Sequence, residues 1–340
     1  GIDKDGRDRT AVCCLSSLNL EKYDEWKDDP NMIADVSINA ADLICPVFIT
    51  EGQNIKEPIE SMPGQFRYSI DRTIEFCNEL IQNKINSIIV FGIPNKKDET
   101  GEISCSSNSI VPKAISELKK VFEDKLFVIA DVCNCEYTTH GHCGTIIDND
   151  VDNDLTLKTL SSQSLVLAKS GADALAPSDM MDGRVKVIRE ILDNNKFEKI
   201  PIFPYSVKYN SAFYGPFREA AKSTPNFGDR KTYQMNFKNS EEAINEVKLD
   251  INEGADVIII KPAISYLDII YRIKKKFNVP IIAYNVSGEY TMVKSASENN
   301  FINDIETILE ILHSIKRSGA NAIISYHALE VAKYLKANDL

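Results

Sequence analysis

Eight short apolar runs that alternate with segments of helical periodicity constrain the fold of this chain more than any other feature. Most runs are continuous rather than alternating in polarity, as expected for strands buried on both faces of a parallel sheet. The predicted strands are Ile44–Thr50, Ser87–Ile93, Leu126–Val132, Ala174–Ser178, Ile200–Ser206, Asp256–Pro262, Ile281–Ser287 and Ala322–His327. The spacing of apolar residues predicts helices over Thr73–Lys84, Val111–Phe122, Leu155–Ala168, Val185–Leu192, Ala243–Ile251 and Ile305–Ile315.

A weak internal repeat supports this alternation. The segments Ser170–Asp173, Glu253–Asp256 and Ser318–Asn321 each place a Gly-Ala pair between a helix and a strand. Glycine at the end of a helix readily adopts the positive φ that terminates it. Ser265 and Asp268 have capping-box spacing and predict the start of the helix after the sixth strand.

The pattern therefore predicts a (β/α)8 barrel, whose chemistry lies at the carboxyl ends of the strands. We expect residues 41–340 to form the barrel. Residues 1–40 lack the rhythm of strands and helices. They are expected to form an N-terminal arm that packs on another subunit, or else a disordered tail.

Composition argues against several classes of partner. The net charge of −11 makes nucleic acids and anionic membranes unsuitable partners for the surface as a whole. No apolar run approaches the ~18–20 residues needed to cross a bilayer. The polar start GIDKDGRDRT shows no secretory signal, so we expect a cytoplasmic protein, with an organellar location left open if a targeting segment has been removed.

Two lysines stand at the ends of neighbouring predicted strands. Lys261 follows the apolar run Val257–Ile260, and Lys208 follows the fifth strand. A lysine that is desolvated at such a place has a lowered pKa, and a neutral amine can attack a carbonyl to form a Schiff base. Two adjacent amines would each lower the pKa of the other. Asp131 and Asp179 could position or deprotonate these lysines, or could simply be structural partners.

Three cysteines follow the third strand in the pattern C-x-C-x7-C, at Cys133, Cys135 and Cys143. This spacing does not match the common structural zinc motifs. Three thiolates with an open fourth position would suit a catalytic zinc ion, whereas reduced loop cysteines or a redox pair are the alternatives. His140 and His142 lie in the same loop as candidate ligands of second rank, and His313 is expected to be structural.

The long segment from Tyr209 to Gln234 is rich in small, aromatic and basic residues. A loop of this length in a compact barrel is often a lid over the active site, although a solvated charged loop is the alternative. An acidic protein needs local cations to hold a substrate carboxylate, and this segment supplies Arg218, Lys222, Arg230 and Lys231.

Several motifs together resemble porphobilinogen synthase, also called 5-aminolevulinate dehydratase. The resemblance runs from about Ile44 to the C-terminus. Its segments are EGQNIKEPIESMPGQFRYSID, DVCNCEYTTHGHCG, APSDMMDGRV, FYGPFREA, GDRKTYQM, IIIKPAISYLDII and YNVSGEY. The resemblance implies that two molecules of 5-aminolevulinate condense, with loss of water, to the pyrrole porphobilinogen of heme biosynthesis.

The resemblance also implies roles for individual residues. Lys261 would form the Schiff base with one substrate molecule, at the P site, and Lys208 would bind the second, at the A site. Arg218, Arg230 and Gln234 would hold the A-site carboxylate, and Ser287 and Tyr326 the P-site carboxylate. Asp131 and Ser178 would line the A site.

The cysteines place the resemblance in the zinc-dependent branch, because other branches carry carboxylates there. Cys133, Cys135 and Cys143 would hold the catalytic zinc. Glu246 matches a contact of an allosteric magnesium ion, or is a solvent-facing helical glutamate. The family is typically a homo-octamer whose arms wrap neighbouring barrels.

Two rival hypotheses remain at this point. A Schiff-base aldolase on a similar barrel would need one amine and no thiol metal site. A zinc-binding or redox-sensing protein without turnover would need neither Lys208 nor Lys261.

Overall fold

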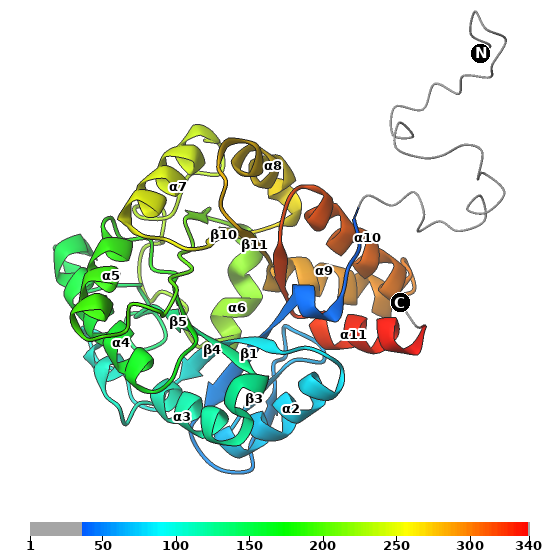
Figure 1. Ribbon diagram of the computed structural model, residues 1–340, viewed down its shortest axis with the longest axis horizontal. Helices are drawn as coiled ribbons and strands as arrows, with labels where there is room; N and C mark the ends of the chain where they lie inside the picture. The colour runs from blue at the N-terminus through cyan, green and yellow to red at the C-terminus, as the bar shows by residue number, and fades with distance from the viewer. Residues whose placement is uncertain (1–35, 339–340) are drawn as a thin grey trace, which may run out of the picture. The chain divides into compact units, whose positions relative to one another are not determined.

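The computed structural model describes residues 36–338, and a sheet of parallel strands alternating with helices forms its centre (Figure 1). The main strands pair side by side in the order β8-β5-β4-β1-β12-β11-β10-β9. In chain order they are β1 (Leu43–Thr50), β4 (Ser87–Ile93), β5 (Phe127–Val132), β8 (Ala174–Pro177), β9 (Val207–Lys208), β10 (Ile258–Lys261), β11 (Ile281–Asn285) and β12 (Ala322–Ser325).

The segment before β9 closes the sheet into a barrel. Phe203 N donates to Leu175 O at 2.7 Å, and Ile259 N donates to Pro204 O at 2.9 Å, so this segment bonds to both β8 and β10. The predicted fifth strand is nevertheless regular only at Val207–Lys208. Pro201 and Pro204 lack the N–H that ladder pairing requires, which explains why the strand is interrupted. The predicted (β/α)8 barrel is confirmed.

Helices cover the outside of the barrel, and the predicted helical segments all overlap observed ones. The helices are α2 (Ile70–Gln82), α3 (Ile110–Phe122), α4 (Asn153–Lys169), α5 (Arg184–Asn194), α6 (Gly215–Ala220), α7 (Glu241–Glu253), α8 (Leu267–Lys276), α9 (Ser287–Glu298), α10 (Asp304–Arg317) and α11 (Ala328–Ala337). Short strands extend the connections: β2 (Lys56–Pro58), β3 (Phe66–Tyr68), β6 (Ile146–Ile147) and β7 (Asp150–Val151).

Two local predictions have different outcomes. Gly171, Gly254 and Gly319 all have φ between 98° and 118°, so the repeated Gly-Ala pair ends its helix in the left-handed region as expected. The capping box at Ser265 is wrong. Helix α8 begins at Leu267 without a side-chain cap, because Ser265 lies in a preceding 3-10 turn.

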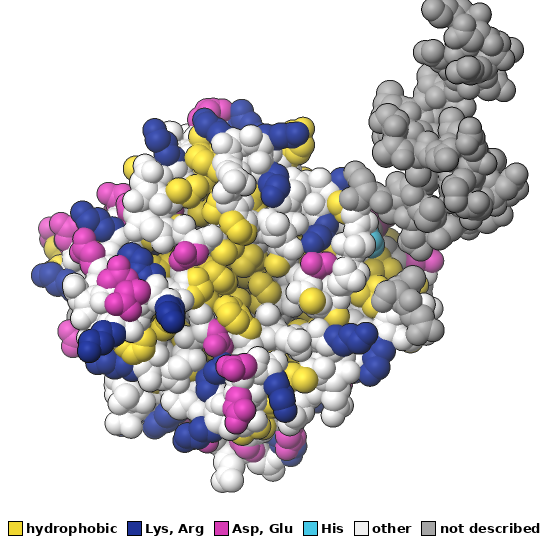
Figure 2. Space-filling model, in the orientation of Figure 1, with side chains coloured by type: hydrophobic (Ala, Val, Ile, Leu, Met, Phe, Trp, Pro, Cys, Tyr) yellow, Lys and Arg dark blue, Asp and Glu magenta, His cyan; other side chains and the backbone are white. Residues whose placement is uncertain are grey.

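The apolar core has two parts. The larger cluster fills the layer between the sheet and the helices, and the smaller one, which is rich in aromatic side chains, fills the barrel. In one face of the molecule, hydrophobic side chains gather over the centre and charged ones of both signs surround them (Figure 2). The aromatic filling matters for function, because it surrounds the end of β10 with a dry environment.

Two other predictions concern the N-terminal arm and membrane-spanning helices. Residues 1–35 of the expected N-terminal arm lie outside them. Among residues 36–338, no helix has the length and apolar character that crossing a bilayer demands.

Candidate active site

Two buried lysines occupy paired positions on adjacent strands. Lys208 is the last residue of β9 and Lys261 the last of β10, and the two are direct partners in the parallel register. Each is only 5% exposed. The register therefore brings both amines to the carboxyl edge of the barrel, where the strand pattern predicted the chemistry.

Aromatic rings surround the amine of Lys261. Its Nζ lies 4.4 Å from the ring centre of Tyr284, 4.7 Å from Phe217, 5.1 Å from Tyr214 and 5.3 Å from Tyr205. Burial in this aromatic box, followed by the positive charge of Lys208, lowers the pKa of Lys261 to about 7. A large fraction of this amine is therefore uncharged at neutral pH, which is the nucleophilic form.

An aspartate from the third barrel strand completes the polar group around the lysines. Burial raises the pKa of Asp131, in β5, to about 8, with Glu136 as the next cause. The Ser178 hydroxyl donates to Asp131 at 3.1 Å, and Lys208 Nζ donates to the carbonyl oxygen of Ser178. These contacts tie three strand ends together. The negative charge of Asp131 also acts on Lys261, whose pKa of about 7 is close to that of Asp131.

The three cysteines after β5 form one buried cluster. The sulfur atoms of Cys133, Cys135 and Cys143 all lie within 4.8 Å of one another, the one group of metal-ligating side chains found among the described residues. Hydrogen bonds from Cys133 and Cys135 hold the pKa of Cys143 well below its usual range. The positive charges of Arg230 and Lys208 add to this lowering, so the cluster borders the lysine pair. Close thiols in an electropositive setting suit a soft cation.

The two histidines of the same loop have other partners. His142 is buried and its ring nitrogens contact Tyr233 Oη at 3.1 Å and Phe227 O at 3.0 Å. His140 Nε2 contacts Glu99 O at 2.9 Å. Neither histidine joins the cysteine cluster, so their second-rank candidacy as ligands is not supported.

The segment predicted as a lid contains a short 3-10 turn, Ala212–Tyr214, and helix α6. Arg230 is buried and its Nη2 donates to Gly141 O and Ser223 O, both at 2.7 Å, which fastens the segment to the cysteine loop. Lys231 instead pairs with Asp229 at 2.6 Å and is exposed. The lid thus presents arginine rather than Lys231 to the interior.

Several buried polar atoms of the lid have no hydrogen-bond partner. They are Arg218 Nε, Arg230 Nε and both amide atoms of Gln234. Burial and the charge of Arg230 together lower the pKa of Arg218. Two guanidinium groups and an amide with unused hydrogen-bond donors suit the binding of a carboxylate. Its negative charge would offset the repulsion between the two arginines, and its oxygens would accept hydrogen bonds from the donors.

The lid also contacts the start of helix α9. Ser287 Oγ accepts from Phe217 N at 3.0 Å and donates to Phe213 O at 3.3 Å. The next residue is Gly288, and a Cβ built there would lie 2.6 Å from Phe213 O. Only glycine allows the lid backbone to approach this closely, so Gly288 determines where the lid sits.

We therefore expect Gly288→Ala to raise the substrate KM at least about tenfold and to cost roughly 1–3 kcal/mol of stability, because overpacking forces backbone shifts. Steady-state kinetics and thermal unfolding measure the two effects. Gly215→Ala is the matched control, since a Cβ at Gly215 meets nothing within 4 Å. Equal behaviour of the two variants would contradict the proposed role of Gly288.

Tyr326 comes immediately after β12. Its hydroxyl hydrogen-bonds with Tyr284 Oη at 3.0 Å, and its ring stacks 6.1 Å from Phe48 within the aromatic core. Tyr284 in turn belongs to the box around Lys261. Ser287 and Tyr326 thus follow the neighbouring strands β11 and β12, and each contacts a residue of the box around Lys261.

Glu246 lies away from the strand ends, on the partly buried side of α7. Burial raises its pKa, and the nearest charges are Arg184, Asp250, Glu242 and Asp182. It is therefore not a freely solvated glutamate. No group of three close metal-ligating side chains within residues 36–338 includes it.

Some residues of the site were missed in the sequence. Tyr205, Tyr214 and Phe217 build the box around Lys261, although they come from two separate segments. Glu136 accepts from Cys135 Sγ at 3.2 Å and is buried. Its place in the sequence between Cys135 and Cys143 was the available signal, since a buried acid beside thiols needs a partner.

Glu289 is another missed residue. It accepts from Ile264 N at 2.7 Å and Val286 N at 2.9 Å, and so joins the loop after Lys261 to the start of α9. Burial raises the pKa of this carboxyl to about 7. Its contact with Val286 is the local capping contact at the start of α9, whereas its contact with Ile264 spans 25 residues and has no local sequence pattern.

Comparisons with known proteins agree with this geometry. Residues 24–334 match the family model of delta-aminolevulinic acid dehydratase. Curated members of that name from Bacillus subtilis and Methanothermus sociabilis are 50% and 51% identical, each over 89% of this chain and 94% of the relative. The Toxoplasma gondii enzyme, solved in complex with its reaction product porphobilinogen, superimposes with a TM-score of 0.91 at 36% identity, covering 100% of this chain and 96% of that one. The chain belongs to the delta-aminolevulinic acid dehydratase family.

Proposed function

We propose that the protein condenses two molecules of 5-aminolevulinate to porphobilinogen through lysine Schiff bases and a cysteine-bound zinc ion. The observation that carries this proposal is the register pairing of Lys208 and Lys261, which brings together two buried amines whose charges interact with a cluster of three thiols. The condensation requires that two keto acid molecules bind at the same time. An aldolase with one amine would not need the second lysine or the thiols.

Lys261 is the proposed covalent nucleophile. Its neutral amine attacks the ketone carbon of one substrate molecule, and a carbinolamine forms. Loss of the carbonyl oxygen as water then leaves the protonated Schiff base, which acts as an electron sink. Asp131, with its pKa of about 8, is placed to supply and retrieve the protons of these steps. Lys208 has the proposed role of binding the second substrate molecule.

Cys133, Cys135 and Cys143 would hold the zinc ion. The donor set fits, because the three sulfurs are mutually close and buried and thiolates are preferred by zinc. When bound there, zinc supplies Lewis-acid polarisation of a carbonyl or water oxygen. The chain itself contributes the electropositive surroundings, since Arg230 and Lys208 both favour the thiolate form of Cys143.

The carboxylates of the two substrate molecules have separate proposed binding groups. Arg218, Arg230 and Gln234 would hold the A-site carboxylate, supported by their unpartnered buried atoms. Ser287 and Tyr326 would hold the P-site carboxylate, supported by their contacts with Phe217 and Tyr284, two residues of the box around Lys261. Asp131 and Ser178 would line the A site, since both contact the environment of Lys208.

Two further parts of the proposal concern assembly and a second metal. Magnesium at Glu246 is supported by the neighbouring carboxylates of Asp250, Glu242 and Asp182, since Mg²⁺ prefers carboxylate and water oxygens, while Arg184 offsets part of their charge. Other ligands would have to be water or come from elsewhere, and no step of the reaction depends on this ion. A homo-octamer and a cytoplasmic location also stay predictions.

Borohydride trapping with 5-aminolevulinate tests the proposal. Reduction of the Schiff base should leave a stable adduct on Lys261, detected by peptide mass spectrometry, and a colorimetric pyrrole assay should show product. Because only the neutral amine reacts and the pKa of Lys261 is about 7, the initial trapping rate should rise as pH increases through 7 and level off above it. An unmodified Lys261, with no pyrrole formed, would exclude the mechanism.

A further inference from the structure

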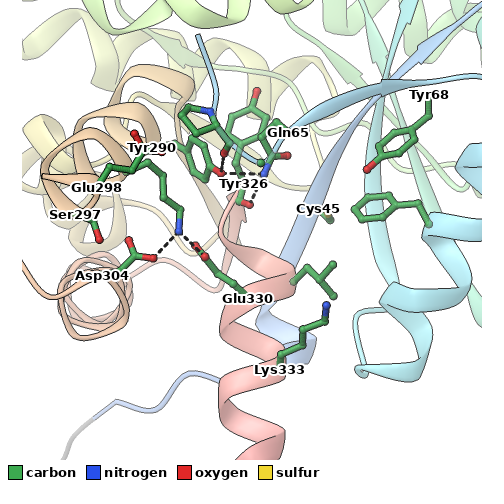
Figure 3. A pocket seen from close by; sticks show the side chains of 15 residues that line it. Cys45, Gln65, Tyr68, Tyr290, Ser297, Glu298, Asp304, Tyr326, Glu330 and Lys333 are labelled. Carbon is green, nitrogen blue, oxygen red and sulfur yellow. Dashed lines mark hydrogen bonds and ion pairs between the residues drawn. The ribbon is translucent and has the colours of Figure 1, made fainter. Parts of the chain in front are cut away.

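A cavity of about 480 Å³ lies next to the proposed P site, on the far side of Tyr326 (Figure 3). The loop Ile59–Gln65 forms one of its walls, and helices α9 and α11 form others. Tyr326, Gln65 and Tyr290 meet at the end of the cavity that faces the barrel. The proposed mechanism uses Tyr326 but leaves the other two residues unexplained.

The loop Ile59–Gln65 closes on itself and is fastened to α9. Ile59 N donates to Gln65 O at 3.0 Å, which brings the two ends of the loop together. The Thr291 hydroxyl donates to Ser61 O at 2.8 Å, and the Tyr290 hydroxyl donates to Pro63 O. Such a fastened loop holds its side chains in fixed positions.

The inner side of this loop belongs to the barrel core. Ile59 and Met62 are 2% and 0% exposed, and both pack in the cluster that contains Tyr205, Phe217 and Tyr284. These three aromatic residues are the ones that surround Lys261. The loop therefore packs into the same apolar core that contains these rings.

Gln65 connects the loop directly to Tyr326. Its Nε2 donates to Tyr326 O and to Tyr290 Oη, each at 3.2 Å (Figure 3). The ring of Tyr290 packs edge-on against Tyr326 at 5.7 Å. The Tyr326 hydroxyl then contacts Tyr284, whose ring lies 4.4 Å from Lys261 Nζ. A continuous set of contacts thus runs from Gln65 to the reactive amine.

We propose that Gln65 and Tyr290 are positioning residues that fix Tyr326 for binding the substrate carboxylate. Neither residue touches the reacting atoms, and both act through the peptide and ring of Tyr326. This assignment rests on the proposed function, because it takes Tyr326 to be the P-site clamp. It extends that function by assigning a role to two residues, one from the loop Ile59–Gln65 and one from α9, that hold Tyr326 in place.

The variants Gln65→Leu and Tyr290→Phe test the assignment. Gln65→Leu removes both donated hydrogen bonds at similar volume, and Tyr290→Phe keeps the ring but removes the hydroxyl. The carboxylate is held equally in the ground and transition states, so each variant should raise KM about tenfold while kcat changes less than twofold. Ser297→Ala, on the same cavity but without a contact to Tyr326, is the control and should behave as wild type.

The double variant gives a sharper test. Both residues act through one group, so Gln65→Leu combined with Tyr290→Phe should raise KM little more than the larger single effect. Wild-type KM in all variants, with normal borohydride trapping on Lys261, would overturn the positioning role and leave the proposed function intact. Absence of the adduct in the wild-type enzyme would overturn the proposed function, and this assignment with it.

Discussion

Lys261→Met is expected to reduce kcat by a factor on the order of 10⁴ or more, because the nucleophile of the covalent step is lost. Methionine has a similar length and is apolar, so it should fill the box formed by Tyr205, Tyr214, Phe217 and Tyr284 without a cavity. The variant should therefore fold with a melting temperature at or above that of the wild type, because a buried amine has been removed.

Two further substitutions separate nucleophile from charge. Lys261→Arg keeps a cation but offers no neutral amine near pH 7, so it should be as inactive as Lys261→Met. Lys208→Met should also impair turnover, yet borohydride should still trap one substrate molecule on Lys261. Substantial pyrrole formation by Lys261→Met, or trapping on Lys208 alone, would show that the two amines have been assigned the wrong roles.

The architecture could be predicted from the sequence because most barrel strands are short, continuous apolar runs. A lysine that ends such a run, as Lys261 does after Val257–Ile260, must lie at the mouth of the barrel. The cysteine cluster was equally local, since its members lie within eleven residues of one another. These features involve residues that are close in sequence, so the pattern of apolar residues and the spacing of the cysteines are enough to predict them.

The remainder of the site depends on contacts between distant segments. The box around Lys261 joins Tyr205, Tyr214 and Phe217 with Tyr284, and Ile59 and Met62 of the loop Ile59–Gln65 pack in the same core cluster. No periodicity indicates which side chains face each other across a barrel. The fifth strand was also placed too simply, because its two prolines allow only partial pairing with β8 and β10.

The docking of the lid illustrates the same limit. Its basic residues could be identified in the sequence, but their contacts could not. Arg230 contacts the cysteine loop, whereas Lys231 pairs with Asp229 on the surface. Gly288 has an unremarkable place at the start of a helix. Its importance follows only from the 2.6 Å distance that a Cβ there would have to Phe213 O.

Cys135→Ala is expected to lower bound zinc to near zero and to abolish most pyrrole formation. Removing one of three thiolates leaves two protein ligands, which is fewer than zinc sites in proteins normally have. Zinc per chain, measured by elemental analysis after gel filtration, gives a readout independent of activity. Cys105→Ala is the control, because Cys105 contacts Thr159 O at 3.4 Å outside the cluster and should leave both zinc and activity unchanged.

A stability effect must be separated from the metal effect in this experiment. Cys135 Sγ donates to the buried Glu136 at 3.2 Å, so alanine removes a partner of that carboxyl as well as a ligand. Cys135→Ser keeps a donor for Glu136 but replaces the soft sulfur by oxygen, and it should lose zinc while retaining more stability than alanine. If either variant turned over at the wild-type rate without bound metal, the thiol cluster would have no part in catalysis, and the lysine pair alone would have to account for the reaction.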